Sequence, residues 1–94
     1  MTPRRFLAAF LLVSAPALAA EQPPGASSCS GCHTTAARGN PAVPRINGQK
    51  ATDIVAAMVN FRSGKRASTV MDRIAKGFSE SETQAIADWL AQQK

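Results

Sequence analysis

The sequence contains only one histidine and two cysteines among its 94 residues. These three side chains, Cys29, Cys32 and His33, all lie in the segment CSGCH. A structural zinc site normally takes four cysteine or histidine ligands, so this set lacks the fourth. A disulfide between Cys29 and Cys32 would close a very short loop and would do little to hold the chain together. A redox dithiol of the thioredoxin type needs a βαβ framework, which this sequence does not predict.

Aromatic residues are also scarce, at 5% of the sequence, and they are not interleaved with basic residues in the manner of nucleic-acid-binding surfaces. The formal net charge is +5. Arg4 and Arg5 belong to the N-terminal leader described next, and without them nine Lys and Arg oppose six Asp and Glu, a formal +3. This modest charge does not indicate nucleic-acid binding, and we set that class aside.

The N-terminus has the pattern of a secretory signal peptide. Arg4 and Arg5 precede an unbroken apolar run over residues 6–13, and Ala17 and Ala19 place small residues at the −3 and −1 positions of a cleavage site. The apolar run is shorter than the roughly 20 residues that a membrane-spanning helix requires. We therefore expect residues 1–19 to be removed, leaving one periplasmic domain over residues 20–94 with no membrane span.

The remaining sequence predicts a small all-α domain, because no segment alternates with period two and no repeat is found. A helix is expected over residues 51–62, with Thr52 as N-cap and Ser63-Gly64 as its stop. A loop over residues 65–70 and a short turn over residues 72–76 follow. The capping box formed by Ser79 and Glu82 predicts the start of the last helix.

The sequence also predicts which face of each longer helix is buried, and which residue caps a short helix at CSGCH. The expected buried faces consist of Ile54, Val55, Met58 and Phe61 in the first helix, and of Ala85, Ile86, Trp89 and Leu90 in the last. Ser27 or Ser28 is expected to cap a short helix at CSGCH. Because so short a chain cannot build a large core, we expect three to four short helices wrapped around one covalently bound haem.

The motif CSGCH itself predicts covalent attachment of haem c. Two intervening residues allow Cys29 and Cys32 to reach the two vinyl groups on one edge of the porphyrin and to form thioethers. His33 follows directly and can then bind the iron through Nε2. Ser30 and Gly31 are small, so they do not obstruct the porphyrin edge.

The sixth iron ligand is expected to be a methionine, because no second histidine exists. After the leader the candidates are Met58 and Met71. Met58 belongs to a predicted helical face, where methionine usually fills a core. Met71 follows an irregular loop that can reach the open face of a haem. We therefore predict Met71, and a methionine opposite a histidine raises the reduction potential, as suits an electron carrier.

The sequence resembles the class I cytochromes c, and within them the single-haem cytochrome subunit of flavocytochrome c sulfide dehydrogenases. The segments that carry the resemblance are VPRINGQ, FRSGKR and TVMDRIAKGFSESE. It implies that Met71 is the axial ligand and that the carbonyl of Pro44 accepts a hydrogen bond from Nδ1–H of His33. It also implies single-electron transfer from an FAD-containing sulfide dehydrogenase subunit, without catalysis by this chain itself.

Other functions remain open from the sequence alone. The cytochrome could diffuse freely and serve another periplasmic dehydrogenase, such as one for sulfite, or a terminal oxidase. A haem enzyme or gas sensor with an open iron site is disfavoured by Met71. The basic cluster of Arg62, Lys65 and Arg66 is either a solvated helix end or a contact for a haem propionate or an acidic partner. Trp89 is expected to pack in the core or against haem.

Overall fold

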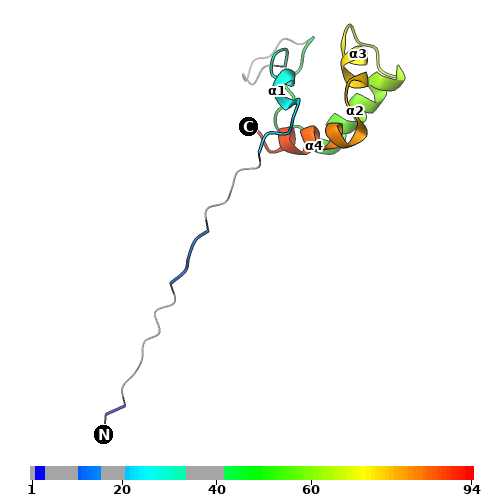
Figure 1. Cartoon of the computed structure of the whole chain (residues 1–94). Helices are drawn as coiled ribbons and strands as arrows, with labels where there is room; N and C mark the ends of the chain where they lie inside the picture. Colours follow the sequence, from blue (N-terminus) through cyan, green and yellow to red (C-terminus); the bar gives the residue numbers. More distant parts are fainter. Residues whose placement is uncertain (1, 4–10, 16–20, 34–41) are drawn as a thin grey trace.

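The computed structural model describes residues 2–3, 11–15, 21–33 and 42–94. Within these segments it has helices and no strand (Figure 1). The helices are α1 (Ala26–Cys29), α2 (Ala51–Ser63), α3 (Met71–Lys76) and α4 (Glu80–Ala91). The predicted all-α class is therefore confirmed. No helix in the described part of the chain is long and apolar enough to cross a membrane. The predicted signal peptide and its cleavage site fall mainly on residues outside the described ranges.

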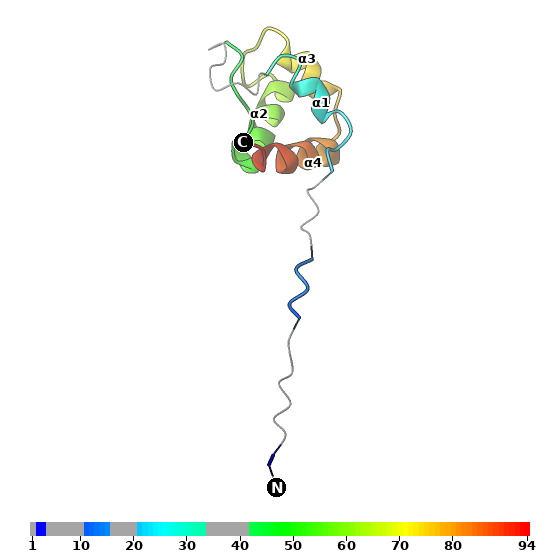
Figure 2. The same ribbon diagram turned by 90° about the vertical axis from the view of Figure 1, so that its left-hand side faces the viewer.

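Helix α2 packs against both α3 and α4. Figure 1 shows α4 along the base of the helical part, with α1 standing at one end and α3 at the other. The end of α4 lies beside the residues that lead into α2 (Figure 2), where the backbone N–H of Gly48 donates to the carbonyl of Leu90 at 2.9 Å. This bond ties the connection after the CSGCH motif to the last helix.

The buried core is small and is built largely from short side chains. One cluster joins α1, α2 and α4, and it consists of Ala26, Ile54, Ile86, Ala87 and Leu90. No large side chain in the described part of the chain is completely buried. The helices thus bury little apolar surface against one another, and much of their inward-facing surface lies outside this core cluster.

Helix α1 begins without a serine cap, so the prediction of Ser27 or Ser28 is wrong. Both serines lie inside the helix, and its N-cap is Gly25, with φ of +87°. A Cβ at Gly25 would lie 2.8 Å from an edge atom of the Phe78 ring. Only glycine satisfies both the left-handed backbone and this close approach, which brings α1 against Phe78 in the connection between α3 and α4.

Helix α2 ends as predicted but does not begin as predicted. Gly64 adopts the left-handed conformation, with φ of +76°, and its N–H donates to the Phe61 carbonyl. At the other end the extended residue Lys50 is the N-cap, with no side-chain capping bond. Its carbonyl accepts from the N–H groups of Asp53 and Ile54. Thr52 therefore lies within the first turn, where its side chain is exposed and cannot cap the helix.

Helix α4 has the predicted capping box, with both reciprocal bonds between Ser79 and Glu82. Hydrogen bonds from Ser79 hold the pKa of the Glu82 carboxyl below its usual value. The bond from the Ser79 backbone contributes most, and the bond from its side chain contributes less. The buried face is shifted from the prediction. Ala85 is exposed and Trp89 is half-buried, whereas the buried residues are Thr83, Ile86, Ala87 and Leu90. Their i, i+3, i+4, i+7 spacing is that of one helical face, and the polar Thr83 hid its start.

We expect Ser79→Ala to lower the free energy of unfolding by about 1 kcal/mol, because it removes an N-cap. Thr52→Ala is the matched control and should change it by less than about 0.5 kcal/mol, since Thr52 caps nothing. Denaturant unfolding of both variants checks this. Because folding lowers the pKa of Glu82, its ionised carboxylate stabilises the fold at pH values above 4.5, the pKa in the unfolded chain. This stabilisation is lost as the pH falls through the lowered pKa of the folded protein. The cost of Ser79→Ala should therefore shrink in acid, and equal costs for the two variants would contradict the assignment.

Candidate functional site

The CSGCH motif occupies the end of α1 and the tight turn after it. The N–H groups of Cys32 and His33 both donate to the carbonyl of Cys29, at 3.3 and 2.8 Å. The two thiols are not bonded to each other. Cys32 is exposed, whereas Cys29 is half-buried, and that burial raises the pKa of its thiol. Redox-active dithiols depend on a lowered thiol pKa, so this environment does not suit thiol–disulfide exchange.

The imidazole of His33 is held by the backbone of Pro44. Its Nδ1 lies 2.5 Å from the Pro44 carbonyl oxygen, the contact that the resemblance implies. A carbonyl oxygen can only accept a hydrogen bond, so Nδ1 carries the proton and Nε2 keeps its lone pair. Such a bond fixes the ring orientation and raises the basicity of the free nitrogen toward a metal. Pro44 contributes this acceptor without an N–H of its own.

The predicted site residues meet around one large cavity of about 950 Å³. Cys29, Cys32, His33 and Met71 all line it, together with Met58. Most of the remaining wall is apolar and comes from all four helices and the connections between them. It includes Val43, Ile46, Ile54, Phe61, Ile74, Phe78, Ile86 and Leu90.

The cavity fits a haem group in size and in chemistry. Its volume lies at the upper end of the roughly 300–1,000 Å³ that is usual for cofactor and ligand sites. The two unpaired thiols stand beside the one imidazole, and a methionine thioether is available in the wall. Among the described residues no group of three or more Cys, His, Asp and Glu side chains could hold a metal ion by itself. The site therefore fits a metal carried within an apolar macrocycle better than a bare ion.

The three residues of the predicted basic cluster have different surroundings. The Arg62 guanidinium donates to the carbonyl oxygens of Ala75 and Phe78, and so joins α2 to the end of α3 and the connection to α4. Lys65 and Arg66 are both exposed. Arg66 also lines the cavity, with its guanidinium carbon 4.8 Å from the centre of the Phe61 ring. No sequence pattern indicated the long-range bonds of Arg62, because they reach backbone carbonyls.

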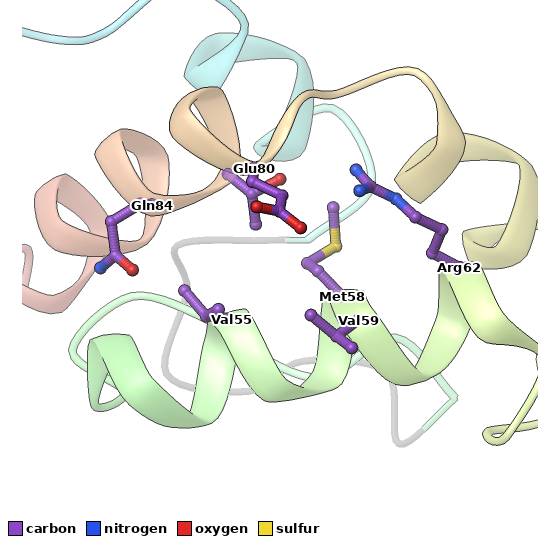
Figure 3. A pocket seen from close by; sticks show the side chains of 7 residues that line it. Val55, Met58, Val59, Arg62, Glu80 and Gln84 are labelled. Atoms are coloured by element: carbon purple, nitrogen blue, oxygen red, sulfur yellow. The ribbon is translucent and has the colours of Figure 1, made fainter.

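Trp89 does not line the large cavity, whereas a second pocket shares Met58 and Thr83 with it. Trp89 packs against the core cluster, in agreement with the expectation of core packing. The second pocket, of about 300 Å³, lies between α2 and α4. Figure 3 shows Val55, Met58, Val59 and Arg62 of α2 facing Glu80 and Gln84 of α4 there. Thr83 also lines this pocket, and its buried hydroxyl has no hydrogen-bond partner among the described residues.

Comparison with known proteins identifies the family. A protein of Chlorobaculum tepidum named cytochrome subunit of sulfide dehydrogenase is 40% identical over 62 residues, which cover 66% of this chain and 56% of the relative. A thiosulfate dehydrogenase electron acceptor of Thiomonas intermedia is 35% identical, over 89% of this chain and 40% of its own length. Cytochrome c-552 of Acidithiobacillus ferridurans is 30% identical, over 68% of this chain and 28% of its own length. No protein-family model matches the chain.

The chain is a class I c-type cytochrome. Members of this family carry covalently bound haem c, and Cys29 and Cys32 have the required separation of two residues. The fold and the electron-transfer role expected from the sequence are thereby confirmed. The chain spans about half or less of the length of these three relatives.

Proposed function

We propose that this cytochrome is a periplasmic carrier of single electrons. Four residues of the cavity wall hold its haem. Cys29 and Cys32 would hold the haem through thioether bonds, and His33 and Met71 would bind its iron. Bound haem c supplies a one-electron ferrous–ferric couple. The observation that carries the proposal is that all four side chains line one apolar cavity. Export as residues 20–94, after removal of the leader, agrees with attachment of haem outside the cytoplasm.

Met71 is preferred over Met58 because of its place in the fold, since both residues line the cavity. Met71 is the first residue of α3 and follows an exposed loop. The backbone N–H of Asp72 donates to Ser68 Oγ at 2.9 Å, which fixes the start of the helix at Met71. Met58 instead lies in the middle of α2 and also borders the second pocket (Figure 3). That position suits a packing role, for which methionine is well adapted.

The proposed electron donor is an FAD-containing sulfide dehydrogenase subunit. One relative is named as the cytochrome subunit of such an enzyme, and the segments FRSGKR and TVMDRIAKGFSESE resemble that family. A second candidate is a freely diffusing cytochrome that accepts electrons from another dehydrogenase. The relative named thiosulfate dehydrogenase electron acceptor favours this alternative and matches more of the chain. In either role the residues of this chain hold and insulate the cofactor and make no bond to a substrate.

We expect Met71→Ala to abolish the low-spin spectrum of a methionine-ligated ferric haem, because it removes the sixth ligand. Met58→Leu should keep that spectrum, since leucine replaces the apolar volume of a packing residue. Absorption spectra of the two oxidised holoproteins, including the weak band from sulfur to iron, measure this. A Met71→Ala protein that keeps the methionine-ligated spectrum would sink the axial assignment.

The proposed partner is tested by purifying the cytochrome from native periplasm with its associated proteins. We expect FAD and haem at a ratio near one to one, and reduction of the haem on addition of sulfide. A haem protein without flavin that is inert to sulfide but is reduced by thiosulfate with a periplasmic extract would support the second candidate. A protein with an open iron site would instead bind carbon monoxide readily once its haem is reduced, contrary to both.

A further inference from the structure

The segment that leads into Met71 is attached mainly at its two ends. Residues 63–70 are all exposed, whereas Met71 itself is partly buried. Near the start of the segment the N–H of Arg66 donates to the carbonyl of Asn60, and at its end the carbonyl of Val70 accepts from the first turn of α3. Residues 67–69 make no backbone–backbone hydrogen bond within the described part of the chain. The position of Met71 therefore depends on what fixes the start of α3.

The hydroxyl of Ser68 fixes that start through two hydrogen bonds to Asp72. Ser68 Oγ accepts the backbone N–H of Asp72 at 2.9 Å, and its O–H donates to Asp72 Oδ1 at 3.2 Å. A hydroxyl can act as acceptor and donor at the same time. We call this pair of bonds the Ser68–Asp72 clasp. It joins a residue three positions before Met71 to the residue directly after it, so Met71 lies inside the closed loop.

The other end of α3 is held by contacts that do not involve the clasp. Arg62 of α2 donates to the carbonyls of Ala75 and Phe78, and Ala75 is buried. These contacts lie beyond the first turn of α3. The first turn can therefore move away from the cavity while the last turn stays attached to α2, and the clasp opposes that movement.

We infer that Ser68 is a positioning residue, whose clasp with Asp72 keeps the Met71 thioether at the iron and limits its replacement by another ligand. The inference rests on the proposed function, because it requires haem c with Met71 as an axial ligand. In the replacement the sulfur–iron bond breaks and a bond from the incoming ligand forms, with no transfer of electrons. The apparent affinity for that ligand falls in proportion to the fraction of protein in which Met71 is displaced. Loss of the clasp raises this fraction.

The test measures equilibrium binding of imidazole to the isolated ferric holoprotein, followed by the loss of the weak band from sulfur to iron. We expect Ser68→Ala to bind imidazole about fivefold more tightly than wild type, as for the loss of one helix-capping side chain. Ser68→Thr keeps the hydroxyl and should stay close to wild type. Asp72→Ala should give a smaller increase than Ser68→Ala, because the backbone N–H at position 72 still reaches the hydroxyl.

Ser79→Ala is the matched control for a general loss of stability. Ser79 Oγ accepts the backbone N–H of Glu82 at the start of α4, much as Ser68 Oγ accepts that of Asp72. The substitution therefore removes the same group from a helix that carries no proposed iron ligand. We expect the imidazole affinity of Ser79→Ala to stay within about twofold of wild type.

An unchanged affinity in Ser68→Ala, or equal increases in Ser68→Ala and Ser79→Ala, would overturn the inference. A changed midpoint potential in Ser68→Ala with unchanged imidazole affinity would do so too, since the hydroxyl would then act on the haem itself. In the double variant, fully additive effects of Ser68→Ala and Asp72→Ala would show that the two residues do not act through a shared bond. A wild-type holoprotein without the sulfur-to-iron band would instead overturn the proposed axial ligand, before any variant is compared.

Discussion

The structure depends on one cavity that the helices surround but do not fill. The buried core between α1, α2 and α4 contains five residues, two of which are alanines. The larger apolar side chains of the helices, such as Ile54 and Phe61, face the cavity of about 950 Å³. A domain of this size buries too little surface to be comfortably stable on its own. The cofactor of a c-type cytochrome supplies the missing apolar surface, so folding and function rest on the same contact.

Two backbone features place the proposed iron-binding end of this cavity. The tight turn after α1 sets Cys29, Cys32 and His33 on one side, and the Pro44 carbonyl fixes the His33 ring from the following connection. That connection is tied in turn to α4 by the bond from Gly48 to Leu90. On α2 and α3, the two bonds of Arg62 hold the segment that begins at Met71. The histidine and the methionine are thus positioned by separate sets of hydrogen bonds to backbone carbonyls.

Much of this arrangement could be predicted because it depends on local sequence signals. The capping box at Ser79, the stop at Gly64 and the CSGCH motif each act within a few residues. The errors have a common cause. Thr52, Ser27 and Ser28 have good capping side chains, but the starts of α1 and α2 are set by backbone geometry at Gly25 and Lys50.

The role of individual basic residues was equally hidden from the sequence. Arg62 and Arg66 are four residues apart, yet one bonds to carbonyls of the α3–α4 segment and the other faces the cavity. The burial of Thr83 was missed because a threonine interrupts the apolar pattern of α4. Each of these features depends on contacts between helices that are distant in sequence, and no local sequence pattern indicates such contacts.

Covalent attachment of haem is tested most directly by the intact mass of the exported protein, measured after denaturation in acidified organic solvent. We predict a chain that begins at Ala20 and retains the mass of one haem, which is lost when Cys29 and Cys32 are both replaced by serine. A chain with no added mass, or one lighter by two hydrogens because Cys29 and Cys32 form a disulfide, would contradict it.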